Sequence, residues 1–184
     1  GIPSEKILKT GSCMKEVLDY YKDKISKSKV LDELKLKSKE FFIVSAHREE
    51  NIDNPLNFEN FLQTLNAIAE KYKYRVLVST HPRTRKKLEQ NSHVKLNSKI
   101  EFMKPFGFSD YIKLQKSAYC SISDSGTITE EASLLSLSAV MIRQAHERPE
   151  GMDSGVLIMS GLQSESVLSA IETSVKMTVP AIVP

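Results

Sequence analysis

The sequence has few of the residues that stabilise small secreted domains or membrane proteins. Its 184 residues contain no tryptophan and only two cysteines, Cys13 and Cys120. Two cysteines cannot build a disulfide framework, so we expect reduced thiols and a cytoplasmic protein. No cysteine or histidine pair has the spacing of zinc ligands, and we expect neither a metal nor another cofactor. No apolar run is long enough to cross a bilayer and no secretory leader is recognisable, so no membrane partner is expected.

An excess of charge is also lacking. Twenty-six basic residues stand against 23 acidic ones, which gives a net charge of +3. A nucleic-acid partner would need a concentrated basic face, and none is expected here. Apolar residues make up 40% and charged residues 27%, as in an ordinary globular protein. The length fits one domain over residues 1–184. Because the chain begins at Gly1 without methionine and its last residues look like the middle of a chain, we expect a domain of a longer protein.

Short apolar runs alternate with amphipathic segments along most of the sequence. The expected strands are residues 41–46, 75–79, 100–103, 119–122, 139–142 and 156–159. The expected helices are residues 55–72, 83–90, 109–116, 127–135 and 164–174. Continuous apolar strands separated by helices predict an α/β fold, with a parallel sheet covered by helices on both faces. Ligands of such sheets bind outside the carboxyl ends of the strands.

The first forty residues have a different pattern. Residues 5–9 predict a short strand, and residues 12–36 are largely helical in pattern and rich in lysine. An apolar stripe in this segment consists of Met14, Val17, Leu18 and Tyr21. The stripe predicts an amphipathic surface helix that packs on the sheet.

The most informative segment is residues 123–131, directly after an expected buried strand. Ser125, Gly126 and Thr127 form a turn before a helix, where free backbone N–H groups at the positive end of the helix dipole suit a phosphate. Glu131, one turn further on, can accept hydrogen bonds from two sugar hydroxyls. The alternative is plain helix capping by Asp124 and Ser125, with Thr127 and Glu130 forming a capping box. The turn is neither a Walker loop nor a G-x-G-x-x-G motif, and Ser125 lacks the G-x-S-x-G elbow of a serine hydrolase.

Other strand ends carry ionisable or aromatic residues. His47 can carry a proton or donate to a phosphate, and Arg48 can bind a phosphate with two N–H groups. Arg148 is a further candidate ligand for a phosphate or a hydroxyl. Each of these loops can equally be a solvated surface loop with weak ion pairs. Tyr111 can stack on a base, although core packing is at least as common for an aromatic residue there.

Four segments together resemble the C-terminal domain of the non-hydrolysing UDP-N-acetylglucosamine 2-epimerase family. They are residues 10–12, 46–51, 123–131 and 147–150, and their order and spacing match over nearly the whole chain. The resemblance implies a Rossmann-like domain that forms one half of a GT-B fold, in which two such domains face each other across a cleft. It also implies a UDP-sugar substrate.

The resemblance gives a role to each candidate residue. Ser125, Gly126 and Thr127 would hold the diphosphate and Glu131 the ribose hydroxyls. The remaining candidates are His47 and Arg148, near the phosphates and the sugar as the catalytic residues of this half, and Tyr111, near the uracil. The family expels UDP by elimination, which gives a 2-acetamidoglycal, and then adds UDP back with the proton on the other face. The acid–base carboxylates lie largely on the N-terminal domain. The missing domain is therefore the expected partner, this chain alone is expected to be inactive, and the complete enzyme is expected to be a homodimer.

At two positions the sequence departs from the usual family pattern, and these departures favour one branch of the family. Thr127 stands where a second glycine is usual, and Phe106 follows Pro105 where a glutamine is usual. With residues 11–18 and 143–151, they resemble the branch that forms UDP-N-acetyl-L-fucosamine for capsule or O-antigen precursors. The alternatives are a UDP-N-acetylglucosamine/UDP-N-acetylmannosamine 2-epimerase, the donor-binding half of a GT-B glycosyltransferase, and a UDP-sugar sensor without catalytic activity.

Overall fold

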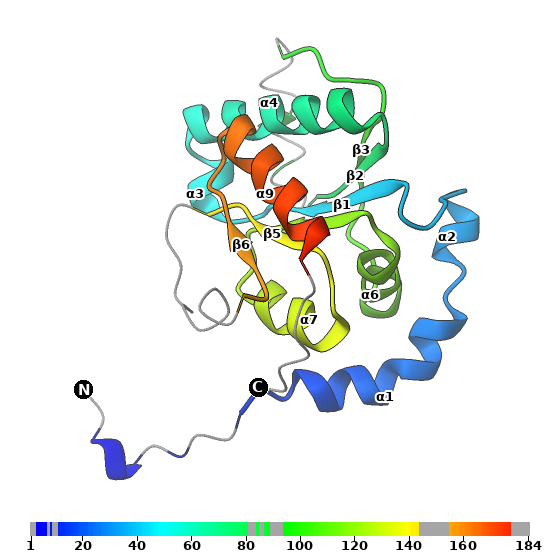
Figure 1. Cartoon of the computed structure of the whole chain (residues 1–184), viewed down its shortest axis with the longest axis vertical. Helices are drawn as coiled ribbons and strands as arrows, with labels where there is room; N and C mark the ends of the chain where they lie inside the picture. The colour runs from blue at the N-terminus through cyan, green and yellow to red at the C-terminus, as the bar shows by residue number, and fades with distance from the viewer. Residues whose placement is uncertain are drawn as a thin grey trace.

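Six short parallel strands form the centre of the molecule (Figure 1). The computed structural model describes residues 3–6, 8, 11–80, 84, 87–88, 94–143 and 155–177. The strands are β1 (Phe41–Ser45), β2 (Arg75–Ser79), β3 (Ile100–Met103), β4 (Cys120–Ser123), β5 (Ala139–Met141) and β6 (Ile158–Met159). Their order is β3-β2-β1-β4-β5-β6 and each pairing is parallel. All six expected strands are present, and the largest shift is at β6, which begins at Ile158 instead of residue 156.

Both faces of the sheet are covered, as the continuous apolar strands predict. Successive residues of a strand point to opposite faces. Phe42 and Val44 of β1 pack with α4 (Pro55–Tyr72) and α9 (Ser164–Lys176). Phe41 and Ile43 pack on the other face with α2 (Val30–Glu33) and α6 (Phe108–Ser117). Figure 1 shows α4 and α9 on one side of the sheet, with α6 and α7 (Ile128–Leu135) on the other. The prediction of a Rossmann-like α/β fold is confirmed.

The longest helix, α4, has the bounds that its local sequence predicts. Asn54 is the N-cap, and its side chain accepts hydrogen bonds from the backbone N–H groups of Leu56 and Asn57 at 3.0 and 3.2 Å. Pro55 occupies the first helical position, where a missing N–H group costs nothing. The helix ends at Tyr72, and the C-cap residue Lys73 takes the left-handed conformation with φ of 60°.

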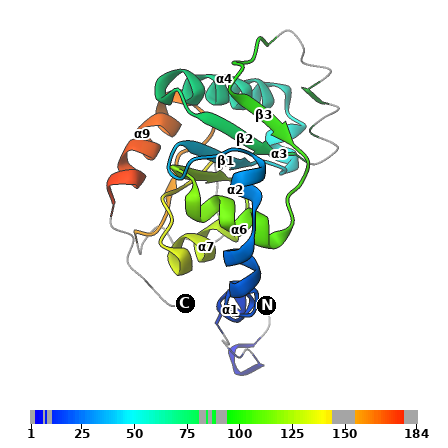
Figure 2. The ribbon, with the colours of Figure 1, turned by 90° about the vertical axis from the view of Figure 1, so that its right-hand side faces the viewer.

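The first forty residues differ from the expectation in three ways. Residues 4–6 form a 3₁₀ turn, η1 (Ser4–Lys6), where a strand was expected. The expected long helix is divided into α1 (Met14–Lys27) and α2, because the Ser28 hydroxyl donates to the Asp110 carboxylate at 2.6 Å and accepts from the Val30 N–H group. The apolar stripe of α1 packs on α6 and α7 through a cluster that includes Leu18 and Ile112, and not on the sheet. Figure 2 shows α1 at the end of the molecule, beyond α6.

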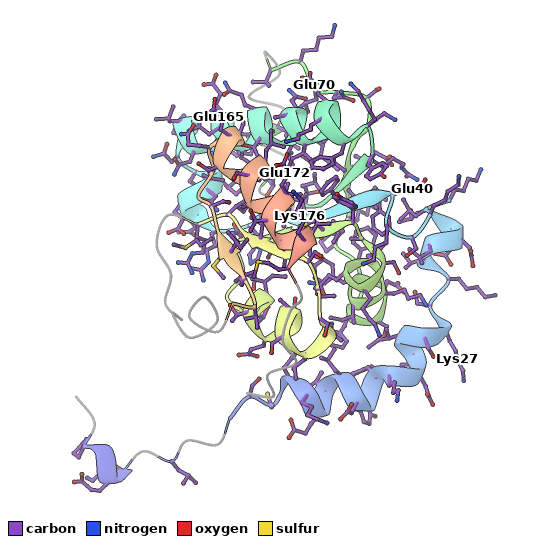
Figure 3. All side chains as sticks on the ribbon, in the orientation of Figure 1. Lys27, Glu40, Glu70, Glu165, Glu172 and Lys176 are labelled. Atoms are coloured by element: carbon purple, nitrogen blue, oxygen red, sulfur yellow. The ribbon has the colours of Figure 1, made fainter. Side chains whose placement is uncertain are left out.

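Charged side chains cover the outer surfaces of the helices (Figure 3). Glu70, Glu165 and Lys176 are exposed on α4 and α9. Glu172 of α9 pairs with Lys71 of α4, which joins the two helices at the surface. Among the described residues, no helix is long and apolar enough to cross a membrane. Both cysteines are free thiols.

Candidate functional site

The strand order places β1 and β4 side by side at the point where the chain changes direction across the sheet. From β1 the chain proceeds to β2 and β3, and from β4 it proceeds to β5 and β6 on the opposite side. Ser45 and Ser123, the last residues of the two strands, lie in register. The loops that follow them therefore meet at one edge. Ligands of open α/β sheets bind at such a switch point. The two polar segments singled out in the sequence, residues 46–51 and 123–131, are brought together here.

A buried carboxylate joins these two loops. Asp124 is fully buried, and its Oδ2 accepts hydrogen bonds from the backbone N–H groups of His47 and Arg48 at 3.0 and 2.9 Å. The Asn51 side chain donates a third hydrogen bond to Oδ2, at 3.1 Å. In return, the Arg48 Nε donates to the Asp124 backbone carbonyl at 2.9 Å. The loop after β1 is thus held in place by a residue of the loop after β4.

The loop after β1 is more ordered than a solvated loop. It contains a short helix, α3 (Glu49–Ile52), which the sequence did not predict. Asn51 is buried and also donates to the Ile142 carbonyl at 3.3 Å. Glu50 accepts from Arg143, a buried arginine that follows β5, at 3.3 Å. The ends of β1, β4 and β5 are therefore connected by polar contacts.

Asp124 and Asn51 were not singled out as functional residues from the sequence. Each lies inside a polar segment in which other residues were the candidate ligands. The available signal was a carboxylate directly after a buried strand, with backbone N–H groups of a second loop predicted at the same edge.

The turn after β4 leaves backbone N–H groups open at the start of α7. The Ile128 N–H group donates to the Ser125 carbonyl at 3.4 Å, and the first i to i−4 bond of the helix runs from Glu131 N–H to the Thr127 carbonyl at 3.0 Å. Within the described part of the chain, the N–H groups of Gly126 and Thr129 have no hydrogen-bond partner. The hydroxyls of Ser125 and Thr127 lie 3.0 Å apart at the surface of this turn. These donors converge on the positive end of a helix dipole, which attracts an anion.

The capping-box alternative is wrong in this structure. Thr127 is the N-cap of α7, but its side chain makes no capping hydrogen bond. The Glu130 carboxylate instead accepts from the Ser12 hydroxyl at 2.7 Å. Glu130 therefore connects α7 to the segment that precedes α1.

Glu131 is buried beside an amide and a phenol from α6. Only 7% of Glu131 is exposed, and its Oε2 accepts from Gln115 Nε2 at 2.6 Å. Tyr111 stands one turn before Gln115 on α6, partly buried against the cluster that includes Phe41 and Leu77. Burial raises the pKa of the Tyr111 hydroxyl well above its usual value, and the nearby Glu131 carboxylate raises this pKa further. Gln115 was missed in the sequence, where its only signal is a polar residue on the buried side of a helix.

Some of the residues predicted from the sequence, and one groove, are not part of this site. Arg148 is outside the described residues, as are His81 and most of the expected helix 83–90. No group of three potential metal ligands occurs among the described residues. A groove of about 590 Å³ lies between α1, α6 and α7, with Leu18, Ile25 and Ile112 among its lining residues. None of the candidate residues lines this groove. Its apolar residues belong to the cluster that joins α1 to α6 and α7.

Comparisons with known proteins identify the family of the chain. A sequence model of the UDP-N-acetylglucosamine 2-epimerase family matches residues 1–181. The chain is 33% identical over 136 residues to the UDP-N-acetylglucosamine 2-epimerase of Methanocaldococcus jannaschii, which covers 72% of this chain and 37% of that protein. It is 30% identical over 185 residues to the Campylobacter jejuni enzyme of the same name, which covers 91% of this chain and 46% of that protein.

Solved structures give the same result for the fold. The UDP-N-acetylglucosamine 2-epimerase from Rickettsia bellii superposes with a TM-score of 0.85 and 46% identity, over 97% of this chain and 47% of that chain. The M. jannaschii epimerase in complex with UDP-GlcNAc and UDP superposes with a TM-score of 0.89 and 28% identity, over 100% and 52% of the two chains. An ADP-heptose heptosyltransferase from E. coli, at 10% identity and a TM-score of 0.57, shares the fold alone.

The described domain has the Rossmann-like fold of its GT-B-type structural neighbours, and the chain spans about half the length of the relatives that it matches. The family match extends over nearly all of its residues. This chain therefore belongs to the UDP-N-acetylglucosamine 2-epimerase family.

Proposed function

We propose that this chain is the UDP-binding C-terminal domain of a nucleotide-sugar 2-epimerase. The observation that carries the proposal is the turn after β4, where open N–H groups stand one helical turn from the buried Glu131 carboxylate. A site for an anion beside an acceptor for hydroxyls suits a nucleoside diphosphate. Membership of the family and the UDP-bound relative from M. jannaschii support this assignment.

The diphosphate is assigned to the turn formed by Ser125, Gly126 and Thr127. The Gly126 N–H group and the two hydroxyls supply donors, and the dipole of α7 favours negative charge at this end. When UDP leaves the sugar, negative charge builds up on the diphosphate. Donors fixed in place before the reaction stabilise that charge without having to reorient.

The ribose is assigned to Glu131 and the uracil to the surroundings of Tyr111. Gln115 holds one oxygen of the Glu131 carboxylate, which fixes its orientation for a pair of hydroxyls. Tyr111 lies one turn before Gln115 on α6 and interacts with the Glu131 carboxylate, so the uracil is assigned to the side of the ribose site that Tyr111 occupies.

His47 and Arg148 are assigned to the reacting side of the site. His47 lies at the end of β1 with about half of its side chain exposed, so a ligand can reach its ring. It would donate a hydrogen bond or a proton to the departing diphosphate, and cationic Arg148 would share the charge. The reaction proposed for the complete protein is elimination of UDP to a 2-acetamidoglycal followed by re-addition. The carboxylates that move the C2 proton would belong to the other domain, which must close over the intermediate.

The finer assignment is epimerisation that yields UDP-N-acetyl-L-fucosamine in capsule or O-antigen precursor synthesis, by a cytoplasmic homodimer. Thr127 and Phe106, which depart from the usual family pattern, support this branch. The test compares the complete protein on UDP-2-acetamido-2,6-dideoxy-L-talose and on UDP-N-acetylglucosamine. Faster turnover of UDP-N-acetylglucosamine would assign the protein to the N-acetylglucosamine/N-acetylmannosamine branch instead.

Replacing Glu131 with glutamine is expected to weaken UDP binding by roughly 10- to 100-fold, because hydrogen bonds to a charged group contribute about 1.5–3 kcal/mol. Isothermal titration calorimetry with UDP measures the change. Repeating the titration with 2′-deoxy-UDP separates the ribose from the rest of the ligand. The wild-type chain should distinguish UDP from 2′-deoxy-UDP, and the variant should distinguish them much less.

The matched control is Glu165→Gln, the same change in the first turn of α9. It should leave UDP affinity at the wild-type value. If Glu131→Gln binds UDP as tightly as the control does, the ribose is not held by Glu131.

A further inference from the structure

One oxygen of the buried Asp124 carboxylate has no role in holding the loops. The three hydrogen bonds that this side chain accepts from the loop after β1 all go to its Oδ2. Its Oδ1 is buried and makes no hydrogen bond within the described part of the chain. A buried carboxylate oxygen without a donor is costly, so such an atom in a native site calls for a function.

The His47 ring lies beside this oxygen. His47 Nδ1 lies 3.3 Å from Asp124 Oδ1. The two residues differ sharply in exposure, since Asp124 is fully buried while about half of the His47 side chain is open. A small rotation of the exposed ring brings Nδ1–H into hydrogen-bonding geometry, whereas Asp124 is held by its other contacts.

We propose that Asp124 is a positioning residue for His47, which fixes the proton of the neutral ring on Nδ1 and leaves Nε2 as the working nitrogen. The proposal rests on the function proposed above and goes beyond it by naming the atom that acts. The proton on one ring nitrogen of a histidine is set by the hydrogen bond that this nitrogen makes. A carboxylate only accepts hydrogen bonds, so Nδ1 must be the donor.

The consequence for the reaction is a defined proton path. Protonated His47 would donate Nε2–H to a diphosphate oxygen as the C1–O bond of the sugar breaks, and it would become neutral with the remaining proton on Nδ1. On re-addition the same Nε2 takes the proton back as the C1–O bond forms. The Asp124 carboxylate keeps the ring oriented, as a buried aspartate does for the histidine of a catalytic triad.

The test is the tautomer of His47 in the chain without ligand, measured by long-range ¹H–¹⁵N NMR with the ring signals assigned through a His47→Gln variant. In neutral His47 we expect the proton on Nδ1, although free histidine prefers Nε2. A proton on Nε2, or an average like that of free histidine, would overturn the proposal. Because no UDP is present, this result is independent of whether the chain binds UDP.

The variant Asp124→Asn sharpens the test. Its amide oxygen must still accept the three N–H groups, so its NH₂ group faces His47 Nδ1, which can then accept only if the proton is on Nε2. We expect the tautomer to reverse in the folded variant. An Nδ1–H tautomer retained in folded Asp124→Asn would show that the carboxylate does not set it. If this variant does not fold, the wild-type measurement still decides the question.

Discussion

Replacing Asp124 with alanine is expected to lower the free energy of unfolding by about 2–5 kcal/mol, a large effect for one side chain. The carboxylate is fully buried and accepts from His47 N–H, Arg48 N–H and Asn51 Nδ2. Alanine removes the acceptor for all three donors at once. Asn51 keeps only its contact with the Ile142 carbonyl. The loop after β1 then loses its hydrogen bonds to the Asp124 side chain and keeps the one from Arg48 Nε to the backbone carbonyl of residue 124.

Urea denaturation followed by circular dichroism measures this change in stability. The matched control is Asp19→Ala, which removes an exposed carboxylate that pairs with Lys15 four residues earlier on α1. Exposed ion pairs of this kind contribute little, so the control should unfold at the wild-type urea concentration. If Asp124→Ala unfolds together with the control, Asp124 does not connect the two loops.

The rate of epimerisation by this chain alone is expected to be at least roughly 10³-fold below that of the complete protein. General acid–base catalysis contributes about 10²–10⁴-fold, and we propose that the carboxylates responsible for it belong to a second domain outside this chain. The chain covers only 47% of the R. bellii epimerase chain and 52% of the M. jannaschii chain. Without the facing domain, the glycal intermediate would also be open to water.

Incorporation of solvent deuterium at C2 of the UDP-sugar provides the measurement. The complete protein should exchange the C2 hydrogen, and the 184-residue chain should not, even where it is saturated with UDP. Exchange by the chain alone would place the acid–base groups on this half. A complete protein that binds UDP-sugar without exchange would be a sensor or a glycosyltransferase.

The elements that the sequence predicts well are those set by local patterns. Residues 55–72 form the expected helix because the cap at Asn54, the proline at the first position and the apolar stripe act within the same segment. The segment 12–36 was expected to be one helix because the contact that divides it, Ser28 with Asp110, joins residues 82 positions apart. No local pattern contains that contact.

The candidate site shows the same division. The turn at residues 125–127 and the carboxylate of Glu131 could be predicted because they follow a buried strand at the binding edge. The long-range contacts of the site could not be predicted. Asp124 contacts the His47 loop only because β1 and β4 are paired in the folded sheet. Gln115 reaches Glu131 only when α6 and α7 lie on the same face of the sheet.

The central claim, that the turn after β4 binds the diphosphate of UDP, is tested most directly by NMR titration of the ¹⁵N-labelled 20.7 kDa chain. UDP and inorganic phosphate are added in separate experiments, and the backbone amide signals are followed. We predict that the amides of Gly126 and Thr129 shift most with UDP and that UDP saturates them at lower concentration than phosphate does. Amide shifts confined to other elements, or no shifts at concentrations of UDP that bind the complete protein, would contradict the claim.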